Sequence, residues 1–134
     1  MDFGFTEEQR RLKRVAREFA EREIAPRVAE YDREERFPIE IALKMGELGM
    51  LGGVVPEQYG GAGMDYMSLT LLGEEIARHC QSLGTICSFA SGLAGSGLLH
   101  FGSEAQKQQY LAPMARGEIF AGAGVTEPHS GSDV

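Results

Sequence analysis

The sequence predicts an all-α protein, an up-and-down bundle of about six helices that ends in the first strand of a β domain. Thr6 and Ser103 are each followed three residues later by a glutamine, the pattern of a capping box at a helix start. Between them, apolar residues recur every three or four positions, which is the period of a helix. Only residues 120–125 alternate large and small side chains as a strand does. With 134 residues, 43% of them hydrophobic, the chain is long enough for one packed core.

Local signals place the first three helices. The first spans about 6–24 and breaks near Pro26, and a short charged helix over about 27–34 follows. Pro38 suits the first position of a third helix, because proline lacks the amide hydrogen that is unused there. Gly49 occupies the position at which a glycine commonly ends a helix.

The last three helices follow a glycine-rich loop over 50–64. Asp65 caps a fourth helix over about 66–80, and the capping box at Ser103 opens a sixth that runs to about Met114. The fifth, 83–101, contains several glycines, each of which costs about 1 kcal/mol relative to alanine in a helix. A helix lying close against another backbone or leaving a channel explains these glycines, and a flexible loop is the alternative.

These segments divide the chain into a helical domain over 1–118 and the start of a middle β domain over 119–134. A single strand cannot satisfy its backbone hydrogen bonds or form a sheet. We therefore expect the chain to be the N-terminal part of a longer protein.

Composition excludes several classes of function. The net charge is −7, and the basic residues near the N-terminus alternate with glutamates, which indicates a solvated helix face and no nucleic-acid binding. Two cysteines are too few for a disulfide framework. The N-terminus lacks the features of a signal peptide, and no apolar run approaches the roughly 20 residues that span a membrane. We expect a soluble, cytoplasmic protein without a membrane span.

Common catalytic and binding motifs do not explain the chain. The three histidines have no carboxylate or cysteine at ligand spacing, so we expect no metal site. Neighbouring residues such as His129 and Ser130 rarely converge as base and nucleophile, and no nucleophile elbow is present. The glycines fit neither a dinucleotide-binding fingerprint nor a Walker loop. The carboxylates that stand out on predicted helices are expected at the solvated surface: Glu74, Glu75 and Glu104.

The segment 126–133 reads TEPHSGSD, and by itself it suits either an ordinary turn or a contact with a cofactor. It matches the pattern TEPxxGSD of the acyl-CoA dehydrogenases, whose N-terminal helical domain the whole chain resembles. The pattern is met at Thr126, Glu127, Pro128, Gly131, Ser132 and Asp133. The resemblance also includes, in order, FTEEQRRL, EFAEREIAP, FPIEIALKMGELGMLG, VPEQYGGAGMDY and FGSEAQKQQYLAPMARGE.

The resemblance implies that FAD is the cofactor and assigns residues to it. Main-chain groups around Val125, and the Thr126 hydroxyl, would bind the pyrimidine edge of the isoalloxazine. Gly131 would allow close backbone approach, and Ser132 would lie at the pyrophosphate and near the phosphopantetheine arm of the substrate. The cofactor-binding set is Ala123, Gly124, Val125, Thr126, Gly131 and Ser132, with Ser132 also contacting substrate.

The same resemblance implies the reaction, α,β-dehydrogenation of an acyl-CoA thioester, with electrons passed to an electron-transferring flavoprotein. It implies a homo-oligomer, a tetramer or dimer of the full-length protein. The catalytic base would lie outside these residues, so no catalytic residue is assigned and the chain alone is expected to be inactive. The helix over 83–101 resembles the one that lines the acyl slot, where Ser91, Gly92 and Gly95 would leave room.

Two other hypotheses stay open. One is a non-enzymatic helical interaction module that has the same fold. The other is a relative of the same fold, an acyl-CoA oxidase or a flavin monooxygenase, although the intact TEPxxGSD pattern favours a dehydrogenase.

Overall fold

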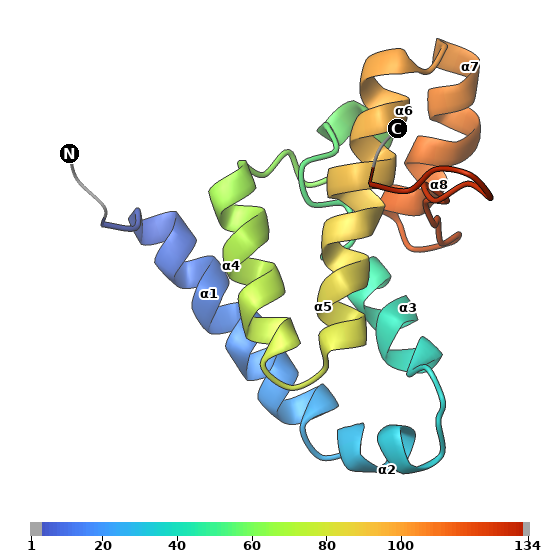
Figure 1. Ribbon diagram of the computed structural model, residues 1–134. Coiled ribbons are helices and arrows are strands. Elements are labelled where there is room, and N and C mark those ends of the chain that lie inside the picture. The colour runs from blue at the N-terminus through green and yellow to red at the C-terminus, as the bar shows by residue number, and fades with distance from the viewer. Residues whose placement is uncertain (1–3, 133–134) are drawn as a thin grey trace.

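The computed structural model describes residues 4–132, and its helices confirm the predicted all-α class (Figure 1). Within these residues the chain forms six continuous helices and one 3-10 turn. Three of the helices change to π-helical winding over part of their length. The elements are α1 (Glu7–Phe19) continued by η1 (Ala20–Ile24), α2 (Val28–Arg33), α3 (Ile39–Glu47), the 3-10 turn η2 (Glu57–Tyr59), α4 (Tyr66–Ala77), α5 (Gln81–Cys87) continued by η3 (Ser88–Ala94) and α6 (Gly95–Phe101), and α7 (Glu104–Gln106) continued by η4 (Lys107–Leu111) and α8 (Ala112–Ala115).

The predicted capping residues fix the helix starts. Thr6 and Ser103 each form a complete capping box with the glutamine three residues later. The Asp65 carboxylate accepts the Ser68 amide at 2.6 Å, and this hydrogen bond lowers the pKa of Asp65. Gly49 has φ +74°, the left-handed conformation expected after α3. Pro38 differs from the prediction, because it precedes the first turn of α3 as its N-cap.

The up-and-down order begins at α4. Figure 1 shows α4, the long helix α5–η3–α6 and the helix α7–η4–α8 running in alternating directions, joined by short turns. On the other side of α4, α1 runs parallel to it, because α2, α3 and a long loop lie between the two helices in the chain. The Gln9 amide donates to Asp65 near one end of this pair, and Arg17 donates to Glu75 further along it.

Two clusters of buried side chains make up the core. The larger one joins α1, η1, α2, α3, α4 and α5, and at its centre Met45, Leu72 and Ile76 are fully buried. The smaller one joins the turn η2 to the last helix, with Val55 and Tyr59 packed on Leu111. The long helix α5–η3–α6 contributes side chains to both clusters.

A buried carboxylate links α1 to α4 and corrects the expectation that Glu75 lies at the surface. Glu75 is only 1% exposed. Its two oxygens accept from the Arg17 guanidinium at 2.9 and 3.0 Å, and the Lys13 ammonium lies 3.4 Å away. Buried charges require such partners, because water no longer solvates them. The neighbouring Glu74 is exposed, as predicted, and pairs with Lys13 at 2.9 Å.

Glycines allow helices and turns to approach within backbone contact. A Cβ added to Gly46 in α3 would lie 2.7 Å from the Arg116 carbonyl oxygen and 2.8 Å from the Gly117 Cα. A Cβ on Gly84 would lie 2.6 Å from the Cβ of Ala77, where α4 and α5 meet. Residues 83–101 are therefore a packed helix and not a flexible loop. Gly97, by contrast, faces open space among the described residues.

The strand predicted over 120–125 is not formed. Within residues 4–132 the structure contains no strand, and an isolated bridge between Glu127 and Ser130 is its single β-type pairing. A strand exists only through hydrogen bonds to a neighbouring strand, and the described residues offer it no such partner. The boundary of a β domain at residue 119 stays a prediction.

The long helix Gln81–Phe101 has 21 residues, more than the sequence pattern indicated. Its most apolar window has a mean hydropathy of 1.3, so its length and composition alone would allow it to cross a membrane. Core helices of soluble proteins share this property. This helix packs along α4, contributes buried residues to the larger core cluster and packs partly buried leucines against the smaller one.

Acidification is expected to weaken the link between α1 and α4. The hydrogen bonds from Arg17 hold the pKa of Glu75 below its ordinary value of 4.5. The ionised carboxylate therefore stabilises the fold fully above that value, and the contribution is lost as pH falls through the lower folded-state pKa. We expect Glu75→Gln to reduce the unfolding free energy at neutral pH and to flatten its fall in acid, measured by urea unfolding. The exposed Glu18→Gln is the control, and equal acid dependence in Glu75→Gln and the unsubstituted chain would contradict the prediction.

Close backbone approach at Gly46 predicts a second effect on stability. We expect Gly46→Ala to lower the unfolding free energy by about 1–3 kcal/mol, because the added methyl group meets backbone atoms that cannot move aside cheaply. Gly97→Ala is the matched control, also within a helix but facing open space, and we expect it to be neutral or stabilising by up to about 1 kcal/mol. Equal effects of the two substitutions would exclude a steric role for the contact.

Candidate functional site

The segment that carries the predicted site residues leaves the helical bundle at Gly117. This residue has φ +72° and touches Gly46, so the turn after α8 is held against α3. Residues 119–132 follow as an irregular segment at the surface (Figure 1). Val125 is 61% exposed, which leaves its main chain open to solvent or to a ligand.

A tight turn brings two of the predicted residues together. The Glu127 amide donates to the Ser130 carbonyl at 2.6 Å, and the Ser130 amide donates back to the Glu127 carbonyl at 3.3 Å. The chain reverses direction between them, which brings Gly131 back beside Thr126. A Cβ added at Gly131 would lie 3.6 Å from the Thr126 Cγ2 and 3.9 Å from its hydroxyl oxygen. The structure thus places the threonine hydroxyl next to a glycine backbone.

The other predicted site residues flank this turn in the sequence. Ala123, Gly124 and Val125 are exposed, and among the described residues nothing lies within 4 Å of a Cβ built on Gly124. Ser132 is exposed beyond the turn. Asp133, the last residue of the TEPxxGSD pattern, lies outside the described residues.

The donors of this segment suit FAD. The Thr126 and Ser132 hydroxyls both donate and accept hydrogen bonds, and the amides of Gly124, Val125 and Gly131 donate them. Neutral donors of this kind bind flavin carbonyls and phosphate oxygens without adding a competing negative charge. Their side chains or backbone lie exposed or half-exposed, so the segment is accessible to a cofactor.

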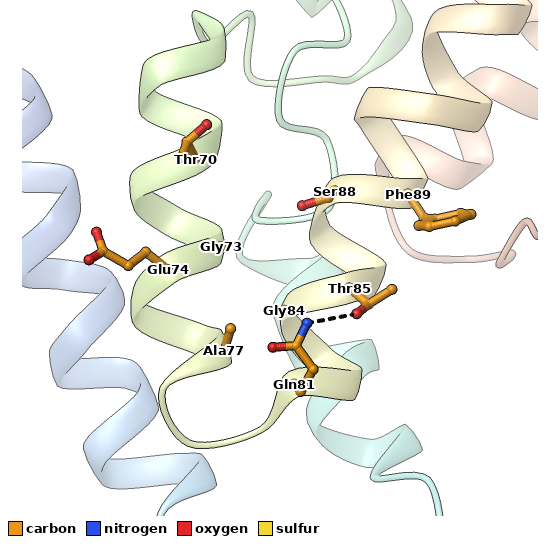
Figure 2. Close-up of a pocket in the computed structure, with 9 residues that line it drawn as sticks. All are labelled: Thr70, Gly73, Glu74, Ala77, Gln81, Gly84, Thr85, Ser88 and Phe89. Atoms are coloured by element: carbon orange, nitrogen blue, oxygen red, sulfur yellow. Dashed lines mark hydrogen bonds between the residues drawn. The ribbon is translucent and has the colours of Figure 1, made fainter.

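A second feature is an open groove between α4 and α5, shown in Figure 2. Its volume is about 420 Å³. Gly73 forms part of its floor, and a Cβ added there would lie 3.6 Å from the Ser88 hydroxyl oxygen. In Figure 2 Ser88 points toward α4, whereas Glu74 points toward α1. The lining residues are Thr70, Gly73, Glu74, Ala77, Gln81, Gly84, Thr85, Ser88 and Phe89, so the groove is separate from the tail segment.

The residues suggested to leave room along the long helix differ from one another. Ser91 is fully buried against Gly53, and its hydroxyl donates to the Cys87 carbonyl at 3.2 Å, so it opens no channel. A Cβ on Gly95 would lie 2.6 Å from the Ala90 carbonyl oxygen of the π-helical turn. Gly92 is half-buried and faces Leu69, with 3.7 Å between an added Cβ and the leucine methyl. Of these three residues, only Gly92 leaves room beside the helix for a neighbouring group.

The other candidate reactive side chains, Glu104 and the two cysteines, are held in structural contacts or in the core. Glu104 accepts from Lys107, which lowers its pKa, and from the Tyr59 hydroxyl at 2.7 Å. Both cysteines are free thiols, and burial raises the pKa of Cys87 to about 12, which leaves it unreactive. In residues 4–132 no three histidine, cysteine, aspartate or glutamate side chains gather as a metal site requires.

Sequence reasoning missed the groove and the buried Glu75. The groove has no sequence signal, because it arises where α4 and α5 diverge. The position of Glu75 had a weak signal: it lies between Leu72 and Ile76, on the apolar stripe of its helix, while Lys13 and Arg17 share one face of α1.

Comparison with known proteins identifies the family. The family model for the acyl-CoA dehydrogenase N-terminal domain matches residues 6–118. The short-chain specific acyl-CoA dehydrogenase of Clostridium acetobutylicum is 44% identical over 133 residues, which are 99% of this chain and 35% of that protein.

Solved structures share the fold at similar coverage. A chain in the structure of the electron transferring flavoprotein of Acidaminococcus fermentans has a TM-score of 0.92 and 41% identity, over 98% of this chain and 35% of that one. The acyl-CoA dehydrogenase of Bacillus anthracis complexed with FAD has a TM-score of 0.80 and 34% identity, over 96% of this chain and 22% of that one.

The chain spans about a third of the length of the curated relatives it matches. The helices, their order and the match over residues 6–118 agree with one another. The chain therefore belongs to the acyl-CoA dehydrogenase family, to whose N-terminal domain these residues correspond.

Proposed function

We propose that this chain is the N-terminal part of an FAD-dependent acyl-CoA dehydrogenase, an oxidoreductase that introduces an α,β double bond into an acyl-CoA thioester. The observation that supports the proposal most directly is the turn at residues 127–130, which places Thr126 beside Gly131 in an exposed strip of hydroxyl and amide donors. A relative with FAD bound has the same fold at 34% identity.

In this proposal the chain binds and orients the cofactor, and FAD supplies the capacity to accept a hydride. The main chain of Ala123, Gly124 and Val125 and the Thr126 hydroxyl hold one edge of the flavin ring. Gly131 lets the backbone approach, and Ser132 lies at the pyrophosphate and near the phosphopantetheine arm of the substrate. The catalytic base belongs, in this proposal, to another part of the protein, so the chain alone is inactive.

Substrate and electron acceptor are inferred from relatives. A 44% identical relative is named as specific for short acyl chains, and we propose a short acyl-CoA for this protein. A similar chain occurs in a structure of an electron transferring flavoprotein, and we propose that such a protein accepts the electrons. Assembly as a homo-oligomer and a cytoplasmic location belong to the same proposal, the latter because Cys80 and Cys87 are free thiols.

The groove between α4 and α5 is the proposed place for the far end of the acyl chain. Small residues such as Gly73, Ala77 and Gly84 line the groove, and no buried charge lies among its lining residues. The length of acyl chain that fits then depends on the few side chains that line it.

The cofactor assignment predicts that Thr126→Ala combined with Ser132→Ala weakens flavin retention. Each lost hydrogen bond contributes on the order of 1 kcal/mol, so the pair should raise the dissociation constant about tenfold or more. Flavin absorbance of the protein made from the complete reading frame after dialysis measures this. Thr126→Ser keeps the hydroxyl and should retain flavin, and Ser82→Ala, an exposed serine on α5, is the neutral control. Unchanged flavin retention in the double variant would contradict the assignment of Thr126 and Ser132 to flavin binding.

The groove assignment predicts a graded change in substrate preference. In the same protein, Gly73→Ala and then Gly73→Val should progressively shorten the longest acyl-CoA that bleaches the flavin, because each substitution narrows the slot beside Ser88. The measurement is flavin bleaching with a panel of straight-chain acyl-CoA thioesters. Gly97→Ala should leave the preference unchanged. A parallel loss of activity with every chain length would place the acyl chain elsewhere.

A further inference from the structure

All three lysines of this chain have a carboxylate partner, whereas among residues 4–132 six of the ten arginines do. The chain has three lysines and ten arginines. Every lysine ammonium lies within hydrogen-bond reach of a carboxylate. The pairs are Lys13 with Glu74 at 2.9 Å, Lys44 with Glu23 at 2.8 Å, and Lys107 with Glu104 at 2.9 Å.

Two of the lysines have further contacts. The Lys13 ammonium also lies 3.4 Å from Glu75, and 5.7 Å from the centre of the Phe5 ring. Lys107 lies 5.9 Å from the centre of the Tyr59 ring, and its side chain is only 16% exposed. The hydrogen bond that Lys13 donates to Glu74 raises the pKa of Lys13, and the one that Lys107 donates to Glu104 raises the pKa of Lys107.

The cations without such a partner are all arginines. In residues 4–132, four basic side chains have no carboxylate within 4 Å: Arg10, Arg11, Arg14 and Arg33. A guanidinium stays protonated at any physiological pH and is a poor nucleophile, whereas a lysine loses its proton more readily and then reacts with electrophiles.

An acyl-CoA thioester is such an electrophile. A neutral lysine amine attacks the thioester carbonyl, the carbon–nitrogen bond forms as the carbon–sulfur bond breaks, and the amine proton leaves with the coenzyme A thiolate. The products are an amide and free coenzyme A, and no oxidant or reductant is needed. The reaction requires the unprotonated amine, whose fraction falls when a carboxylate stabilises the ammonium.

We propose that the carboxylates paired with Lys13 and Lys107 shield these two lysines from acylation by the thioester that the protein uses. This inference rests on the proposed function, because a protein that binds acyl-CoA holds this electrophile at its own surface. The shielding itself is a property of the chain, so it is measurable apart from flavin binding or turnover.

The test measures acetylation at each lysine by peptide mass spectrometry after treating the folded chain with acetyl-CoA at mildly alkaline pH. Glu104→Gln removes the charge beside Lys107, and we expect Lys107 to react about three- to tenfold faster, because Glu104 no longer raises the pKa of the amine. Lys13 and Lys44 in the same molecule are internal controls and should not change.

Arg14→Lys is the second variant, because it introduces a lysine where no carboxylate lies within 4 Å of the native side chain. The introduced lysine should react several-fold faster than Lys13 and Lys107. This comparison removes no native contact, so it decides the question even if Glu104→Gln loosens the fold and all lysines react faster.

Repeating both comparisons with N-hydroxysuccinimidyl acetate separates this inference from the proposed function, since that reagent does not depend on recognition of coenzyme A. Slow reaction of Lys13 and Lys107 with both reagents supports the shielding, even if the protein proves not to bind flavin. Equal rates for the introduced lysine and these two lysines, or an unchanged Lys107 in folded Glu104→Gln, would overturn it.

Discussion

A carboxylate that is buried between two helices needs cations within hydrogen-bond reach, and this requirement determines how α1 lies on α4. Glu75 is fully enclosed, with both oxygens bound by Arg17 and with Lys13 nearby. A guanidinium binds a carboxylate through two parallel hydrogen bonds only in a narrow range of orientations. The pair therefore fixes the relative position of the two parallel helices more tightly than apolar contacts, which tolerate sliding, would do.

Close contacts at glycines also fix the position of the candidate site relative to the helices. Gly84 brings α5 against α4, and Gly46 brings the turn at Gly117 against α3. Because Gly117 begins the segment that carries Thr126 and Gly131, the base of the candidate flavin strip is held by backbone contact. The groove at Gly73 lies where α4 packs against α5.

The candidate site was predictable in its residues but only partly in its geometry. The pattern TEPxxGSD pointed to Thr126, Gly131 and Ser132, and the turn at 127–130 brings the first two together. The strand expected over 120–125 is absent from the described residues, since alternation in a sequence shows what a strand would bury and not whether a neighbouring strand is present.

By itself the sequence determined the helices, because the signals that set them are local. The helix caps act over three residues, so they can be recognised in the sequence without knowledge of the fold. They are the capping boxes at Thr6 and Ser103 and the aspartate cap at Asp65. Only the tertiary structure decided that Glu75 is buried and that Lys13 has carboxylate partners on α4. Those properties depend on contacts between residues more than fifty positions apart in the chain, such as Arg17 and Glu75. A local sequence pattern does not show which distant residues come into contact.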